Sequence, residues 1–154
     1  MATTASAQLH DSTNQVVYGG GSFSMNAAGK QTLVLAGGYG FDLGGGLWQM
    51  TTAQIGIKQY GVVAVDLIRM FEISKTQTGT FYAGVTAGPN VDWIGESATG
   101  GYLAYITGAA GGVLQYRFPS DIGISVAGKY KFALEEDVLY PDGFQLFAGL
   151  TKNF

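Results

Sequence analysis

The chain has 154 residues, a formal net charge of −3, and charged side chains at only 12% of its positions, about half the share of an ordinary soluble domain. A single core or one small barrel fits this length, and the acidic balance with scattered basic residues argues against a nucleic-acid partner. The absence of cysteine excludes a disulfide framework, a thiolate metal site and a cysteine nucleophile.

Residues 1–13 are small and polar, and we expect them to form a disordered tail outside the fold. The remainder, residues 14–154, is predicted to be a single domain. In this part, apolar residues recur at every second position, and glycine, proline, asparagine and aspartate separate the runs. Such a period is typical of β-strands, because successive side chains of a strand point to opposite faces.

Eight strands are predicted in chain order, at residues 14–26, 30–43, 46–59, 62–74, 80–89, 101–118, 121–135 and 143–154. All are longer than the usual strand of about 5–6 residues, and they match the ~9–11 residues that a tilted strand needs to cross a bilayer, plus short extensions. The clearest alternation lies in residues 121–135, where one face carries Ile122, Ile124 and Val126 and the other carries Lys129 and Lys131. This pattern predicts an all-β fold, an eight-stranded antiparallel up-and-down transmembrane β-barrel.

The connections between these strands favour the same architecture. Membrane barrels alternate short periplasmic turns with longer external loops. With the amino terminus on the periplasmic side, residues 43–46 and 118–121 are expected to be turns, and residues 89–100 and 135–143 the longest loops. Proline has no N–H for a strand ladder, so we expect all three prolines at strand ends or in connections.

Residues 97–116 contain no charge and are long enough for a transmembrane helix, which is an alternative for this segment. Against it, the segment is rich in glycine, and its aromatic and polar positions alternate. A lone helix would also leave the other seven alternating runs unexplained.

If the apolar faces meet lipid, the opposite faces form a lumen, which eight strands make just wide enough for side chains to fill. The charged positions expected to form a network there are Asp66, Glu72, Arg117, Asp121, Lys129 and Lys131. Buried charges need partners, and both signs are present, so this network is predicted to plug the barrel. A narrow ion path is the functional alternative.

Arg69 does not follow this pattern. Strict alternation places it on the lipid face in the middle of a strand, where an arginine costs ~2–4 kcal/mol. We therefore expect a β-bulge near Leu67 and Ile68 that turns Arg69 inward, toward Asp66.

No set of residues points to catalysis, metal binding or a cofactor. The one histidine, His10, lies in the tail, so the barrel body has no histidine to activate a serine. The acids at 135–137 lack the spacing of a metal loop. The glycine runs at 19–21 and 44–46 lack the strand-to-helix context of a phosphate loop. We expect a protein that is not an enzyme and has no cofactor.

The sequence resembles the small eight-stranded outer-membrane barrels of the OmpA and OmpX type, over residues 14–154 as an architecture. The most specific piece is the last strand, with apolar Phe144, Leu146 and Leu150 in alternation and a terminal Phe154. The resemblance implies that Phe154 is part of the signal that the outer-membrane insertion machinery reads. One departure is Lys152, where the family has an apolar or aromatic residue; a lysine there can reach the interface.

The resemblance implies a bacterial outer-membrane protein, embedded in a lipid bilayer, with a structural or surface-interaction role. A monomer is expected, with an external ligand at loops 89–100 and 135–143. The alternatives are a narrow pore and a soluble lipocalin-like carrier of small molecules. The carrier would place its apolar residues inside and its charges outside, so the facing of the strands distinguishes it from the membrane barrel.

Overall fold

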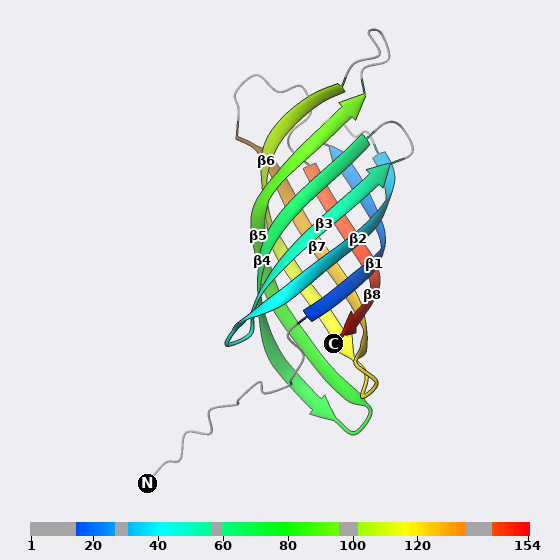
Figure 1. Cartoon of the computed structure of the whole chain (residues 1–154), viewed down its shortest axis with the longest axis vertical. Helices are drawn as coiled ribbons and strands as arrows, with labels where there is room; N and C mark the ends of the chain where they lie inside the picture. The colour runs from blue at the N-terminus through cyan, green and yellow to red at the C-terminus, as the bar shows by residue number, and fades with distance from the viewer. Residues whose placement is uncertain (1–14, 27–30, 57–59, 96–101, 135–142) are drawn as a thin grey trace.

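In the computed structural model, eight antiparallel strands close into a barrel in which each strand pairs with its neighbours in sequence and β1 pairs with β8 (Figure 1). The structure describes residues 15–26, 31–56, 60–95, 102–134 and 143–154. The strands are β1 (Gln15–Asn26), β2 (Gln31–Gly44), β3 (Leu47–Gly56), β4 (Tyr60–Thr76), β5 (Gly79–Gly95), β6 (Tyr102–Arg117), β7 (Ile122–Ala133) and β8 (Gly143–Asn153). The predicted fold class is confirmed.

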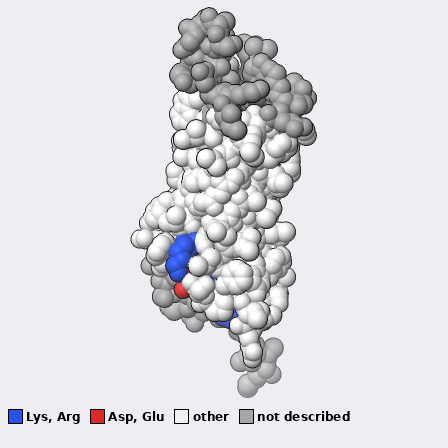
Figure 2. Space-filling view, turned by 90° about the vertical axis from the view of Figure 1, so that its right-hand side faces the viewer, with Lys and Arg blue, Asp and Glu red and all other residues white. Residues whose placement is uncertain are grey.

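The two faces of each strand differ as the alternation predicts. On β7, Ile124 and Val126 are exposed on the outer face, whereas Lys129 and Lys131 are buried inside. Figure 2 shows one side of the molecule, on which the charged side chains of the described residues lie near the end that carries the termini. Large apolar side chains also cover the outer face of the other strands, among them Leu33, Leu35, Ile55, Leu67, Val85, Ile106, Leu114, Leu146 and Leu150. A soluble carrier would place its apolar side chains inside and its charged side chains outside, which is the opposite of what this barrel shows.

Both ends of the described chain and three short turns lie at one end of the barrel, called here the terminal end (Figure 1). The β2–β3 turn runs through Gly44, Gly45 and Gly46, all with positive φ, a conformation that glycine adopts without strain. In the β6–β7 turn, Asp121 has a φ of 61° and its carbonyl oxygen accepts a hydrogen bond of 2.9 Å from the Asn153 amide. The two expected turns therefore lie where the sequence placed them.

The β4–β5 hairpin is longer than predicted. β4 continues to Thr76 and β5 begins at Gly79, so a two-residue turn joins them. The pairing of β3 with β4 starts at Leu47 and Arg69, and the Met70 amide donates one more hydrogen bond of 2.9 Å to the Gly46 carbonyl of the β2–β3 turn. Beyond Met70, the register of β4 continues with β5 alone. The hairpin consequently projects beyond the rim at the terminal end (Figure 1).

The expectation that β5 ends at Pro89 is wrong. The strand runs on to Gly95, and Pro89 pairs with Gly108 of β6. On its other side, the ladder between β4 and β5 is interrupted at Pro89: it stops at Ala64–Asn90 and resumes at Leu67–Ala87. The missing N–H of proline is tolerated at this interruption, so residues 89–95 are strand and not part of an external loop.

The expected bulge beside Arg69 is also wrong. The register between β3 and β4 is continuous from Leu47–Arg69 to Gly56–Tyr60, and Arg69 stays on the outer face, exposed. It lies level with the first residue of β3, at the rim, with its guanidinium 5.8 Å from the centre of the Phe71 ring. An arginine at this depth can extend its charge toward water and needs no inward turn.

Of residues 97–116, for which a helix was the alternative, the described part from Tyr102 onward belongs to β6 (Tyr102–Arg117). No helix in the described part of the chain is long and apolar enough to cross a membrane. The expected tail, residues 1–13, lies outside the described residues.

Candidate functional site

The lumen is the one region of the described barrel where charged and polar side chains are buried together. The alternation of β1 and of β3 to β8 directs them inward, and the barrel wall separates them from the outer face. The buried polar and charged side chains are Ser22, Thr52, Gln54, Asp66, Thr80, Thr86, Asn90, Asp92, Thr107, Gln115, Lys129, Lys131, Gln145, Thr151 and Asn153. Buried tyrosine, valine, alanine and phenylalanine side chains fill the space between them, including the cluster of Tyr18, Ala36 and Phe147.

The first of two buried ion pairs joins Lys129 of β7 to Asp66 of β4 across the lumen. The Lys129 ammonium also lies 5.1 Å from the centre of the Phe147 ring, so an aromatic face supports the charge from a second side. Asp66 lies on β4 where the ladder to β5 is interrupted at Pro89. Both side chains are almost fully buried, which makes each charge dependent on the other.

The second pair joins Lys131 of β7 to Asp92 of β5 and lies further from the terminal end. Thr107, on β6 between these strands, donates a 2.6 Å hydrogen bond to the other carboxylate oxygen of Asp92. Asn90 in turn donates to the Thr107 hydroxyl at 3.4 Å. This layer therefore holds a lysine, a carboxylate and two neutral polar groups from three adjacent strands.

The predicted network residues are only partly brought together. Asp66, Lys129 and Lys131 lie inside the lumen, and Arg117 lies near its terminal end with the guanidinium 5.0 Å from the centre of the Tyr82 ring. Glu72 is not in this group, because it lies on the projecting part of β4 and is exposed.

Asp121 is also outside the network, since it belongs to the β6–β7 turn. The residue that sequence reasoning missed is Asp92, because a strand ending at Pro89 left it in a loop. Its alternation with buried Asn90 is the signal that could have found it.

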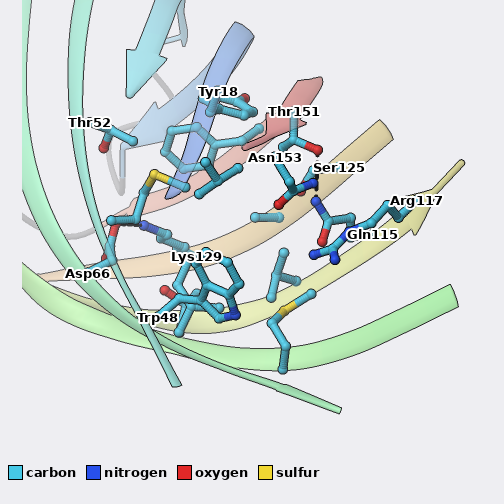
Figure 3. A pocket seen from close by; sticks show the side chains of 18 residues that line it. Tyr18, Trp48, Thr52, Asp66, Gln115, Arg117, Ser125, Lys129, Thr151 and Asn153 are labelled. Carbon is cyan, nitrogen blue, oxygen red and sulfur yellow. Dashed lines mark hydrogen bonds and ion pairs between the residues drawn. The ribbon is translucent and has the colours of Figure 1, made fainter. Parts of the chain in front are cut away.

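A cavity lies between the Lys129–Asp66 pair and the terminal end (Figure 3). Its volume is about 90 Å³. Trp48, near the start of β3, lines this cavity together with Tyr18, Met50 and Phe147. Gln115 donates a 2.8 Å hydrogen bond to Thr151 on its wall.

The predicted insertion residue, Phe154, follows β8 and is exposed on the outer face. Its amide donates a 3.0 Å hydrogen bond to the Gln15 carbonyl, which ties the end of the chain to the start of β1. The Lys152 ammonium lies 5.9 Å from the Phe154 ring centre and donates a 2.8 Å hydrogen bond to the Ser120 carbonyl. Lys152 thus reaches the rim rather than the middle of the outer face.

Among the described residues, no group of three or more histidine, cysteine, aspartate or glutamate side chains could hold a metal ion. The acidic run at 135–137 and the second expected loop, apart from Gly143 at the start of β8, lie outside the described residues.

The barrel is similar to solved structures of small outer-membrane proteins. It matches the N-terminal β-barrel domain of Pseudomonas aeruginosa OprF with a TM-score of 0.71 at 17% identity, over 92% of this chain and 98% of that one. Neisserial surface protein A (NspA) matches with a TM-score of 0.64 at 10% identity, over 94% and 98%. Ail, the attachment invasion locus protein of Yersinia pestis, matches with a TM-score of 0.53 at 11% identity, over 92% and 97%.

No family model matches the sequence, and no curated protein matches it. The structural likenesses show the fold: this chain has the closed, eight-stranded antiparallel β-barrel fold of small outer-membrane proteins.

Proposed function

We propose that the protein resides in the bacterial outer membrane as a monomeric barrel with a closed lumen, and that its role is structural or one of surface interaction. The observation that carries the closed lumen is the presence of two buried ion pairs, Lys129–Asp66 and Lys131–Asp92, at successive levels. An ion crossing the lumen would have to separate these charges in a poorly hydrated interior, and a buried charge without its partner costs several kcal/mol.

Surface interaction is supported by two of the similar proteins. One is called a surface protein, and the other an attachment invasion locus protein. In our proposal, an external ligand binds at the connections from β5 to β6 and from β7 to β8, next to the strand ends that lie opposite the terminal end. The terminal end would then face the periplasm.

The remaining partners follow from the outer face and the last strand. The apolar outer side chains bind the lipid bilayer, and the strand that ends at Phe154 is read by the insertion machinery. We propose neither an enzymatic activity nor a cofactor or nucleic-acid partner for this barrel.

A narrow pore is the second candidate, and the cavity near the terminal end favours it, because it removes part of the barrier to ions. Recording from the refolded protein in planar bilayers separates the two. We expect no stable open channel, or only small and irregular events. Long-lived, uniform conductance steps that change ion selectivity in a Lys129→Met/Lys131→Met variant would contradict the closed lumen.

Fractionation of cells that produce the chain with an amino-terminal signal peptide tests the location. We expect heat-modifiable protein in the outer-membrane fraction, and a Phe154→Ala variant should insert less efficiently. Folded protein in the soluble fraction would contradict the membrane assignment.

A further inference from the structure

The outer face of the described strands carries cations at the terminal end and no acid. Leaving aside the projecting part of the β4–β5 hairpin, the charged side chains that point outward are Arg69 of β4 and Lys152 of β8. The described acids lie elsewhere: Asp66 and Asp92 in the lumen, Asp42 on the inward side of β2, Glu72 on the projecting part of β4 and Asp121 in the β6–β7 turn.

The register places Arg69 at the edge of the apolar band. β3 has 10 residues, and it pairs with β4 from Gly56–Tyr60 to Leu47–Arg69. At ~3.4 Å per residue and a tilt of ~45°, a strand of this length rises about 24 Å, close to the ~25 Å height of the apolar band of a membrane barrel. Arg69 therefore lies at the level where the hydrocarbon ends and the lipid headgroups begin.

The neighbours of Arg69 on the outer face are apolar. Leu47 of β3 and Val85 of β5 pair with it, and Leu67 and Phe71 are the outward residues before and after it on β4. Its guanidinium lies 5.8 Å from the centre of the Phe71 ring, which holds the charge toward the terminal end. The counter-charge of Arg69 must consequently come from outside the outer face of the barrel.

The hydrogen-bonding capacity of this guanidinium is also open. Arg69 makes no ion pair and donates no hydrogen bond to another described residue, although a guanidinium has five donors. Lys152 differs, because its ammonium donates to the Ser120 carbonyl. A Cβ at Gly45 would lie 3.6 Å from Arg69 Nη1, so the guanidinium borders the β2–β3 turn at a residue with no side chain to cover or neutralise it.

We propose that Arg69 binds the phosphate of an anionic phospholipid, one whose headgroup carries no cation, at the terminal rim. A guanidinium donates two parallel hydrogen bonds to a phosphate. The ammonium of a zwitterionic headgroup would need a carboxylate beside it, and the outer face offers none. The proposal rests on the membrane location and the orientation proposed above, which put this lipid in the periplasmic leaflet.

Quenching of a fluorophore beside Arg69 measures which lipid gathers there. The native chain has no cysteine, and Ala87 is exposed on β5 opposite Leu67, one outward position deeper than Arg69. An Ala87→Cys variant is labelled and refolded into phosphatidylcholine vesicles that contain a small fraction of lipid brominated on its acyl chains. The brominated lipid is either phosphatidylglycerol or phosphatidylcholine, at equal mole fraction, and the ratio of the two quenching efficiencies reports local enrichment.

We expect phosphatidylglycerol to be enriched about fivefold at this position, which is the effect of one basic residue near an anionic membrane surface. Adding Arg69→Gln should reduce the enrichment to about one. Lys75→Gln removes the same charge from the exposed, projecting part of β4 and should leave the enrichment unchanged.

The β2–β3 turn provides a second pair of variants. Gly45 has a φ of 64°, a conformation that asparagine and aspartate also adopt. Gly45→Asp places a carboxylate beside the guanidinium and should abolish the enrichment, because it takes the place of the lipid phosphate. Gly45→Asn has nearly the same shape without the charge and should retain it.

Three results would overturn the proposal. Equal quenching by the two brominated lipids in the Ala87→Cys protein would show no headgroup preference, and equal losses in the Arg69→Gln and Lys75→Gln variants would show only a general attraction to basic protein. Loss of the enrichment in excess inorganic phosphate would show a site for the free anion. Failure of the membrane location is seen separately, because the protein would then show no heat-modifiable mobility and no quenching by brominated phosphatidylcholine.

Discussion

Lys131 and Asp92 form a buried ion pair across β6, with the Thr107 hydroxyl bonded to the second oxygen of the carboxylate. The three residues come from three neighbouring strands, β7, β6 and β5. Their side chains meet because the register pairs Thr107 with Asn90 on one side and with Ala133 on the other. The layer thus depends on strand pairing as much as on the residues themselves.

Removing one partner of this pair should destabilise the barrel strongly. Asp92→Ala leaves the Lys131 ammonium buried without its counter-ion, and we expect a loss of about 3–5 kcal/mol in the free energy of unfolding. Urea titration in lipid vesicles measures it. Glu72→Ala removes an exposed carboxylate and serves as the control, with a change of about 0.5 kcal/mol or less. Equal effects of the two changes would contradict the role assigned to the pair.

An arginine introduced on the outer face should lower the free energy of unfolding more in the middle of the barrel than at the rim. Val126 is 40% exposed in the middle of β7, and Val126→Arg is expected to cost ~2–4 kcal/mol. Ile122, 43% exposed on the same face, begins β7 at the rim, where Ile122→Arg is expected to cost about 0–1 kcal/mol. The same vesicle titration compares them. If the order of the two losses were reversed, the membrane would not be centred on the middle of the barrel.

The position of Arg69 at the rim makes a related prediction on β4. Arg69→Gln should change the unfolding free energy by less than about 1 kcal/mol, because the arginine is exposed and close to water. Leu67→Arg, one outward position deeper, should cost more, about 2 kcal/mol. Quenching of a fluorophore attached to a cysteine at each position by lipids labelled at known depths gives an independent check. Equal depths for residues 67 and 69 would disagree with this assignment.

Two glycines should respond oppositely to an added methyl group. A Cβ at Gly111 would overlap the Gly128 carbonyl oxygen on β7, whereas a Cβ at Gly19 would meet nothing within 4 Å. Gly111→Ala must push two strands apart and is expected to cost about 1–3 kcal/mol. Gly19→Ala should be neutral or slightly stabilising, since alanine reduces the freedom of the unfolded chain. Urea titration of both variants measures the difference, and a neutral Gly111→Ala would indicate that β6 and β7 are less closely packed than described.

Sequence alone determined which face each strand presents, because side chains alternate with a fixed period of two. Val126 outside and Lys129 inside follow from that period without any knowledge of neighbouring strands. The low charge content predicted that the outer face meets lipid, because a soluble protein rarely exposes an apolar surface that covers every strand. The eight strands and their up-and-down order follow from the spacing of the runs.

Only the tertiary structure decided where strands end and which residues stand level with one another. β5 continues past Pro89 because the ladder on its β4 side opens there, and this continuation places Asp92 beside Lys131. The stagger of β3 against β4 puts Arg69 at the rim, a matter of depth that alternation does not contain. Facing is a local property of each strand, whereas depth and pairing across the lumen depend on how all eight strands close.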